Sequence, residues 1–375
     1  MPDDERGRNY GAPVGALCTA LLRVGLSVTV ITHERGLPGL TLRGPRINFI
    51  RVASRASPKL QIADFFAQER RAMKRAALAI DADVVHAHWT YEWQRVALDL
   101  GLPMVVTIHD APWTVFIQNR GPYWALRALH SLWNRVRTPA HTQLVGVSHY
   151  VSDRWKRQHV WPGDVQVIPN VVEVEVDMED LHQDRGVVGS EAFLLEIADS
   201  SRRKRSHLLA ARYARLGLPW VMEFAGKGLD ESFRARVAKR AELPNIRMRG
   251  PLARGATMKR LAQARAHVHA SAEESFGLTV VESLILGVPV VVDTKSGGAA
   301  ENLKKYNVGV TVDFRRARDQ ELTAAISQAI EGAPLVRQMA PTVRSEHSGP
   351  TVAARYIKVY RRAIASSSAL ARRSE

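Results

Sequence analysis

Short apolar runs rich in β-branched residues alternate along the chain with longer segments in which apolar residues recur every three or four positions. The short runs predict strands, and the longer segments predict amphipathic helices. The predicted strands are 27–32, 84–88, 104–108, 143–147 and 165–168 in the first half, and 193–197, 221–225, 246–249, 266–269, 289–292 and 309–312 in the second. Strands that alternate with helices predict an α/β protein built on parallel sheets.

The length of 375 residues suits two domains better than one core. We place an N-terminal domain at 1–175, an acidic linker at 176–190, a C-terminal domain at 191–348, and a closing helix with a tail at 349–375. Each domain is expected to be doubly wound and Rossmann-like. Such a domain normally opens with a strand that lies in mid-sheet, and no strand is predicted before the first helix. We therefore hypothesise that the natural protein starts further upstream or is truncated here.

Composition narrows the class of protein. The sequence is 46% hydrophobic and 24% charged, which favours a soluble globular protein, and no apolar run approaches the ~20 residues of a membrane span. The single Cys18 excludes an internal disulfide, and the acidic start is no signal peptide, so a cytoplasmic location is expected. The net charge of +16 suits a polyanionic ligand, but the absence of a recognition motif argues against nucleic acid.

An acidic loop before an apolar helix is the strongest candidate for chemistry. Glu274 and Glu282 lie eight positions apart, and the apolar run after Gly277 predicts a helix. The amides of Phe276, Gly277 and Leu278 would then point out of a helix N-terminus, where anions bind. Glu282 would accept hydrogen bonds from ribose hydroxyls, and Glu274 would face a sugar. The alternative is one acidic residue favoured by the helix dipole and one solvated helix glutamate.

The wider pattern resembles that of the family 4 retaining glycosyltransferases. Residues 274–301 hold Glu-x-Phe-Gly-x4-Glu, then Gly-x-Pro-Val-Val, then Gly-Gly-x-x-Glu. Other segments that match the family follow in its usual order, at 83–88, 107–110, 147–148, 168–170, 225–228, 245–250 and 266–271. The resemblance implies a GT-B fold, in which two doubly wound domains face a cleft and the C-terminal helix returns to the first domain. It also implies a nucleoside-diphosphate-sugar donor, retention of anomeric configuration, and no metal or other cofactor.

The resemblance assigns roles to individual residues. Glu282 would bind the ribose, Glu274 would contact the transferred sugar, and His109 would lie beside that sugar. Lys204 matches the family's phosphate-neutralising lysine. The implied catalytic set is Glu274, His109 and Lys204, and the implied donor-binding set is Glu282, Ser275, Phe276, Gly277, Leu278, Arg203 and Gly226.

One departure from the family pattern affects the phosphate site. The family's arginine position holds Asp199, which cannot neutralise phosphate, so Arg203 or Arg202 would have to replace it from the same loop. This departure favours one alternative, a degenerate homologue that acts as a binding module. A GT-B nucleotide-sugar epimerase is a second alternative, against which the Glu-x-Phe-Gly-x4-Glu signature argues.

The first domain is expected to hold the acceptor, a saccharide or lipid-linked saccharide, with Gly11, Trp89 and Trp113 on the acceptor side. Both tryptophans follow strand ends, where they would stack on sugar faces or simply pack a surface. The basic amphipathic stretch 118–137 suggests peripheral contact with an anionic membrane at the inner face of the cell membrane, or packing on its own domain. The expected activity is sugar transfer in surface polysaccharide or glycolipid synthesis.

Overall fold

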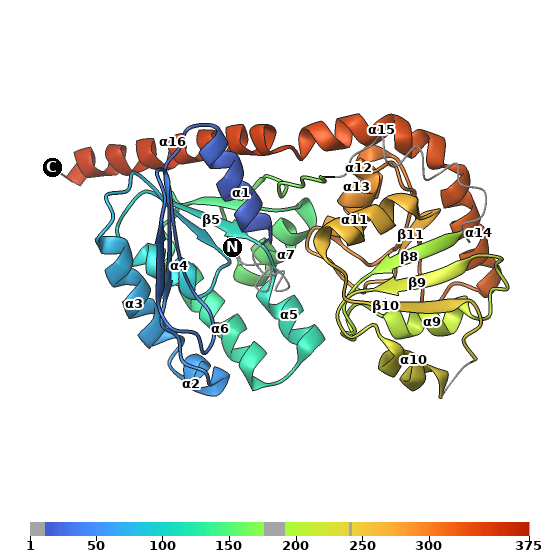
Figure 1. The fold of residues 1–375 in the computed structure, drawn as a ribbon. Helices are drawn as coiled ribbons and strands as arrows, with labels where there is room; N and C mark the ends of the chain where they lie inside the picture. Colours follow the sequence, from blue (N-terminus) through green and yellow to red (C-terminus); the bar gives the residue numbers. More distant parts are fainter. Residues whose placement is uncertain (1–11, 176–191, 240–241, 375) are drawn as a thin grey trace. The chain divides into compact units, whose positions relative to one another are not determined.

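The structure is a computed structural model that describes residues 12–175, 192–239 and 242–374 (Figure 1). These residues fall into two compact units, which we call the first unit (12–171 and 349–374) and the second unit (172–348). Three predictions lie outside the described residues: Gly11 on the acceptor side, the linker at 176–190, and the segment before the first helix.

The second unit is built on one parallel six-stranded sheet with the order β10-β9-β8-β11-β12-β13. The strands are β8 Phe193–Ile197, β9 Val221–Ala225, β10 Ile246–Gly250, β11 Ala266–His269, β12 Val290–Asp293 and β13 Val310–Val312. The chain winds outward from β8 in one direction and from β11 in the other, so the order reverses between these two strands. Sheets of this type bind ligands outside the carboxyl ends of the strands at such a reversal. The loops that follow β8 and β11 are therefore the first place to look for a site.

Helices cover both faces of this sheet and bury its apolar side chains. They are α9 Ser206–Tyr213, α10 Glu231–Ala238, α11 Arg254–Gln263, α12 Leu278–Ile285, α13 Gly298–Tyr306, α14 Asp319–Glu331 and α15 Ala333–Glu346. The core includes Leu194, Met222, Phe224 and Phe314, none of which is exposed. Burial of each such side chain stabilises the fold by about 1.5–3 kcal/mol.

The first unit has its strands in two sheets. A parallel sheet holds β4 Val85–His88, β5 Met104–Ile108, β6 Gln143–Gly146 and β7 Gln166–Val167 in chain order. A second sheet holds β1 Val28–His33, β3 Ile47–Val52 and β2 Leu40–Arg43, and β2 runs antiparallel to β3. Strands β2 and β3 were not predicted from the sequence. All four residues of β2 are exposed, so this strand has no buried apolar face that a periodicity argument would detect.

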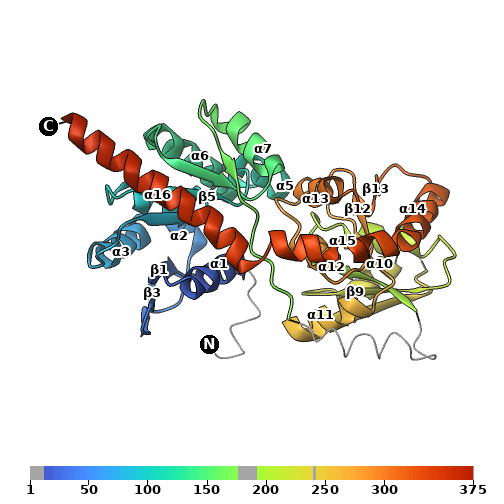
Figure 2. The same cartoon turned by 90° about the horizontal axis from the view of Figure 1, so that it is seen from above.

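The helices of the first unit include the last helix of the chain. They are α1 Ala12–Arg23, α2 Pro58–Ala63, α3 Ala67–Leu78, α4 Glu92–Leu98, α5 Pro112–Asn119, α6 Pro122–Arg137, α7 His149–His159 and α16 Gly349–Ser374. Helix α16 packs along α1 and β5, as Figure 2 shows from above. Its Val352 and Tyr356 share a core with Leu17 and Val105. The predicted fold class, two parallel-sheet α/β units with a C-terminal helix that returns to the first, is confirmed.

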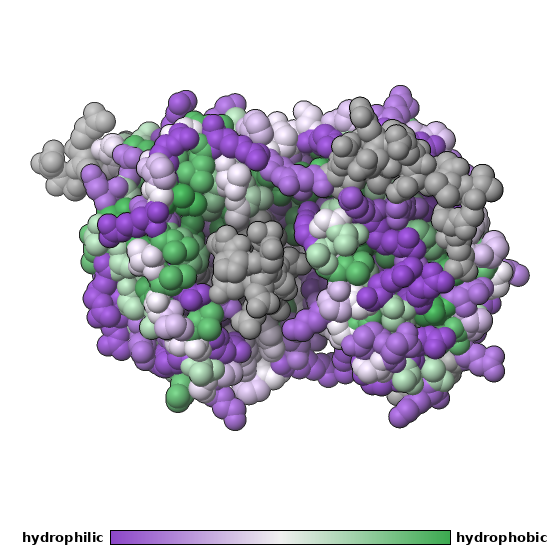
Figure 3. Space-filling model, viewed as in Figure 1, coloured by the Kyte–Doolittle hydropathy of each residue, from purple (hydrophilic) through white to green (hydrophobic). Residues whose placement is uncertain are grey.

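Two features of the structure concern contact with a membrane. None of the helices in the described ranges is both long and apolar enough to cross a bilayer. On the face shown in Figure 3, hydrophobic residues lie in small groups that are interrupted by hydrophilic ones.

Candidate active site

The loops that follow β8 and β11 meet at the strand-order reversal of the second unit. The amide of Ala272 donates to the carbonyl of Arg203 over 2.8 Å, which ties the two loops together. The Lys204 ammonium lies 2.5 Å from Glu274 Oε1, and Arg203 Nη1 lies 3.4 Å from Glu274 Oε2. Three predicted site residues from two distant segments therefore form one ionic group.

The two cations keep Glu274 ionised in a confined place. Its side chain is only 13% exposed, and burial alone would raise its pKa. Attraction to Lys204, a hydrogen bond with His269 and attraction to Arg203 together outweigh burial and hold the pKa of Glu274 well below its usual value. His269, at the end of β11, places Nε2 3.6 Å from Glu274 Oε1, and burial lowers the pKa of this histidine. The group thus combines two basic side chains with one ionised carboxylate.

The loop between Glu274 and helix α12 is held by close backbone packing against α13. Gly277 caps α12 with a φ of 82°, and a Cβ there would lie 2.6 Å from the Cβ of Ala299. A Cβ on Gly298 would lie 2.3 Å from the carbonyl oxygen of Ser275, and the amide of Gly298 donates to the Glu274 carbonyl over 2.8 Å. The predicted start of the helix at Gly277 is confirmed. Its first amides remain available outside the helix's own hydrogen bonds, as at any helix N-terminus.

The Phe276 side chain serves the core. It is 5% exposed, and its ring packs edge-on against His347 with 5.5 Å between the ring centroids. The Phe276 carbonyl accepts a hydrogen bond from Asn302 Nδ2 over 2.8 Å. These contacts fix the backbone of the loop, so only the amide of Phe276 is left for the ligand role that the sequence suggested.

Glu282 lies inside α12 and is 3% exposed. Its Oε1 lies 2.5 Å from Arg254 Nη1, at the start of α11, and its Oε2 is buried without a hydrogen-bond partner. Burial raises the pKa of Glu282, and the pairing with Arg254 offsets this only in part. A buried carboxylate with an unused oxygen is costly unless a further donor reaches it.

Gly226 and Asp199 lie in the loops that follow β9 and β8, respectively. Gly226 has a φ of 137°, and a Cβ there would lie 1.8 Å from the Ala198 carbonyl oxygen, so no other residue fits where β9 passes the end of β8. Asp199 Oδ1 accepts a hydrogen bond from the amide of Ser201 over 2.8 Å. Asp199 therefore shapes the loop that carries Arg203 and Lys204, although it cannot supply the charge of an arginine.

His109 belongs to a half-buried group of histidines at the carboxyl ends of β4 and β5 in the first unit. Its Nε2 lies 2.9 Å from His88 Nδ1, and His86 contacts Tyr360 and Thr107 at 2.9 and 2.7 Å. Burial lowers the pKa of all three histidines, that of His88 to about 4. Because His88 and His109 are both neutral at pH 7, a single proton is shared between the two facing nitrogens.

The two predicted acceptor-side tryptophans lie near the same strand ends. Trp89 has a left-handed φ of 64°, and its ring centroid lies 4.5 Å from that of His109. Trp113 lies in the first turn of α5, where its amide donates to Gln158 Oε1 over 3.0 Å and its ring packs edge-on against Phe116. The structure brings Trp89, but not Trp113, into direct contact with His109.

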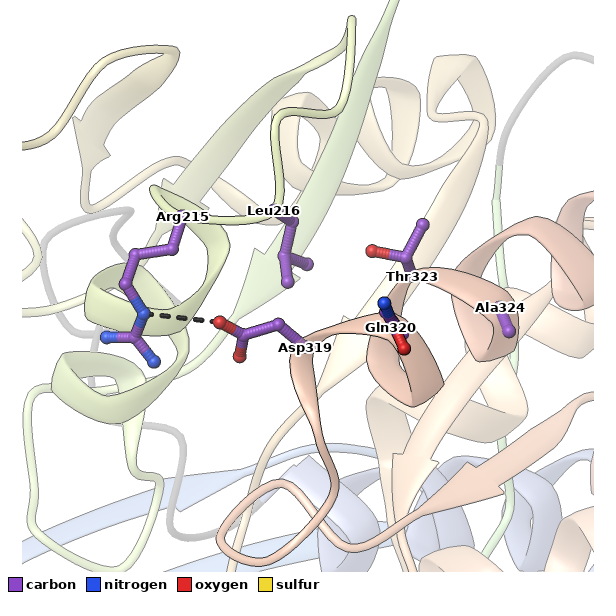
Figure 4. Close-up of a pocket in the computed structure, with 6 residues that line it drawn as sticks. All are labelled: Arg215, Leu216, Asp319, Gln320, Thr323 and Ala324. Atoms are coloured by element: carbon purple, nitrogen blue, oxygen red, sulfur yellow. Dashed lines mark hydrogen bonds and ion pairs between the residues drawn. The ribbon is translucent and has the colours of Figure 1, made fainter.

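A pocket in the described part of the chain lies elsewhere in the second unit. It has a volume of about 480 Å³ and is lined by Arg215, Leu216, Asp319, Gln320, Thr323 and Ala324. Figure 4 shows Arg215 and Asp319 pointing toward one another, 3.3 Å apart. None of the predicted site residues lines it. Nor do the described residues contain a group of three or more His, Cys, Asp or Glu side chains arranged to hold a metal ion.

Sequence reasoning missed two residues that touch the predicted carboxylates. His269 ends a strand directly before the acidic loop, and strand-end position is a signal that could have singled it out. Arg254 pairs with Glu282 across 28 positions of sequence, and no motif links the two. Such a contact follows only from the packing of α11 beside α12.

Comparison with known proteins identifies the family. The model for Glycosyltransferase Family 4 matches residues 14–176, and that for Glycosyl transferases group 1 matches residues 177–346. A GDP-mannose-dependent alpha-mannosyltransferase of Mycolicibacterium smegmatis is 25% identical over 308 residues, which cover 78% of this chain and 77% of the relative.

Solved structures share the fold. Sucrose-phosphate synthase from Thermosynechococcus elongatus superposes with a TM-score of 0.73 at 17% identity, covering 94% of this chain and 93% of that one. Anabaena HepE in complex with UDP and glucose gives a TM-score of 0.63 at 17% identity, covering 88% and 98%. The solved structures show the GT-B fold, and the two family matches, which together span residues 14–346, show that the chain belongs to the family 4 glycosyltransferases.

Proposed function

We propose that the chain transfers a sugar from a nucleoside diphosphate to a hydroxyl of a saccharide or lipid-linked saccharide, with retention of anomeric configuration. The observation that carries this proposal is the ionic group at the strand-order reversal, where Lys204 and Arg203 meet Glu274 beside the start of α12. A surface polysaccharide or a glycolipid is the proposed product.

We assign each part of the proposed donor to a contact in the second unit. Glu282 would accept hydrogen bonds from the ribose, since its buried Oε2 has no hydrogen-bond partner in the protein. The amides of residues 276–278 at the start of α12 would receive the diphosphate or the sugar. Because the curated relative named above uses GDP-mannose, we propose a GDP-sugar, with mannose first, as the donor to test.

Lys204 and Arg203 would neutralise the leaving diphosphate. The bond between the sugar's C1 and the diphosphate oxygen breaks as the acceptor oxygen attacks C1 from the same face. A diphosphate oxygen then takes the proton of the acceptor hydroxyl. Two cations at one loop supply the charge stabilisation that this step needs, so we propose that no metal is required. Arg203, which shares Glu274 with Lys204, is the proposed substitute for the arginine that Asp199 replaces.

Glu274 and His109 would act on the sugar itself. With a strongly depressed pKa, Glu274 is ionised throughout the neutral range and suits electrostatic support of an oxocarbenium-like transition state better than proton transfer. His109, held neutral by burial and fixed by His88, suits a hydrogen bond to a sugar hydroxyl. Trp89, against the His109 ring, is the proposed acceptor-side platform.

We further propose an anionic membrane as a peripheral partner, at the inner face of the cell membrane, because helix α6 is inverted in polarity. Leu129, Trp133 and Val136 face outward and are 45, 52 and 74% exposed. The buried face of the helix is polar and includes Arg127, His130, Ser131 and Asn134. An apolar outer face next to exposed Arg137 suits the interface of an anionic bilayer.

A donor screen tests the proposed activity. UDP-, GDP- and ADP-sugars are incubated with a membrane extract that supplies acceptors, and radiolabel transfer and the anomeric configuration of the product are measured. We expect transfer with retention. Lys204→Ala should lower kcat by about 100-fold, and Glu282→Ala should raise the donor KM by about tenfold. Arg315→Ala, an exposed charge loss in the same unit, is the control.

The outcomes separate the alternatives. Donor binding without transfer or hydrolysis would identify a binding module, and conversion of the donor into its epimer would identify an epimerase. Kinetics like those of the wild type in both the Lys204 and Glu282 variants would reject the site assignment.

A further inference from the structure

In the proposed function, the carboxylate of Glu282 binds the ribose of the donor. In the structure, this carboxylate forms an ion pair with Arg254. Arg254 Nη1 lies 2.5 Å from Oε1, and Oε2 is buried without a partner. The side chain of Glu282 is 3% exposed, whereas that of Arg254 is 57% exposed. Because Arg254 occupies Oε1 and the protein buries Oε2, neither oxygen is open to an incoming hydroxyl while this ion pair is formed.

The two partners differ in how easily they move. Glu282 is fixed in α12 between Val281 and Ser283, both fully buried. Arg254 starts α11 at the surface, and its guanidinium is already largely hydrated. An exposed arginine leaves an ion pair at little cost, because water replaces what it loses. A buried carboxylate left without a partner is strongly unfavourable, so a replacement donor must arrive as the arginine leaves.

We propose that Arg254 is a built-in competitor of the donor's ribose, and that a nucleoside diphosphate binds at Glu282 only by displacing it. This inference rests on the proposed role of Glu282 in donor binding. Two ribose hydroxyls supply the two donors that the carboxylate needs, one for each oxygen, whereas Arg254 reaches only Oε1. The ribose therefore satisfies the buried Oε2 that Arg254 leaves unpaired.

Competition between Arg254 and the ribose can be told apart from attraction between Arg254 and the diphosphate. A ligand with ribose hydroxyls must break the ion pair, but a 2′,3′-dideoxy ligand gains nothing from Glu282 and leaves the pair intact. Removal of Arg254 should therefore tighten binding of the ribose form only. If Arg254 instead attracted the diphosphate, its removal would weaken the binding of both forms.

The test is isothermal titration calorimetry with GDP and 2′,3′-dideoxy-GDP, and with the UDP and ADP pairs in parallel. The proteins are the wild type, Arg254→Ala, Arg254→Gln and the control Arg315→Ala. We expect Arg254→Ala to bind the ribose form about two- to tenfold more tightly, the range for one partly exposed ion pair, and the dideoxy form unchanged. Arg254→Gln, which keeps a donor but no charge, should lie between, and Arg315→Ala should match the wild type.

Several results would overturn the inference. Unchanged or weaker binding of the ribose form by Arg254→Ala shows that the arginine does not compete, even if the wild type binds nucleotide and the proposed function stands. An equal effect on both forms shows a general charge effect. If no protein binds any of the three nucleotides, the proposed donor site fails as well. Binding by Arg254→Ala alone would support the inference most strongly.

Discussion

At the scale of single residues, Glu196 on β8 is a carboxylic acid that the proposed chemistry does not use. Its side chain is 1% exposed, Oε2 has no hydrogen-bond partner, and burial raises its pKa to about 8. The ordinary value is 4.5, so between these two pH values the folded protein holds a proton that the unfolded chain has lost. The stability contributed by this group is complete below about pH 4.5 and is lost as the pH rises toward 8.

We predict that Glu196→Gln removes this dependence on pH. As the pH rises from 5 to 8, the free energy of unfolding of the wild type should fall relative to that of the variant, on the order of 1 kcal/mol for each pH unit. Urea unfolding of both proteins across this range measures the difference, and the buried histidines cancel because both proteins contain them. Glu231→Gln, at an exposed position, is the control. Parallel pH profiles for the wild type and Glu196→Gln would contradict the prediction.

At the scale of the element, helix α6 shows why an amphipathic sequence pattern does not determine which face of a helix packs against the protein. The basic amphipathic pattern of 118–137 suggested either a membrane face or a packed face, and the structure shows that packing uses the polar side. Asn134 donates to the Tyr91 carbonyl over 2.7 Å, and Arg127 lies 3.1 Å from Glu92. These polar partners come from the segment after β4. Because the polar side chains of the helix pack inside, its apolar side chains are left outside.

We predict that the outer face of α6 drives binding to anionic vesicles. Replacement of Leu129, Trp133 and Val136 by serine should lower vesicle affinity by at least tenfold, since each side chain contributes about 1 kcal/mol on entering the bilayer interface. Co-sedimentation with vesicles of phosphatidylglycerol and phosphatidylcholine measures this. Leu335→Ser removes an exposed apolar side chain from the second unit and serves as control. Equal sedimentation of the triple variant and the wild type would exclude this face as the membrane contact.

The elements that place the candidate site were predictable, and several of its contacts were not. Strands β8, β9 and β11 are short, buried runs rich in apolar residues, and this pattern predicted their bounds and placed the loop of Glu274 directly after β11. Strand β2 carries no such pattern because all of its residues are exposed. The contact of Arg254 with Glu282 depends on how α11 lies against α12. A contact between residues far apart in the sequence produces no periodic pattern from which it could be predicted.

At the scale of the molecule, the last helix belongs to a different unit from the residues before it. Helix α15 ends in the second unit, whereas α16 fills the core of the first with Val352, Ala353 and Tyr356. The two units have separate hydrophobic cores, around Leu194 and Phe224 in one and Val105 and Val145 in the other. Damage to α16 should therefore unfold the first unit before the second unit.

Ala353→Glu tests this separation, because it buries a carboxylate at a position with no exposure. The cost of several kcal/mol should fall on the first unit, since the new charge has no partner there. Hydrogen exchange measured by mass spectrometry should show lost protection in peptides that cover β5, with protection of β11 retained. Lys358→Glu places the same side chain on the exposed face of the same helix and should change neither. Equal loss in β5 and β11 would show instead that the two units unfold as one cooperative body, and that the chain's crossing at residue 349 couples their stabilities.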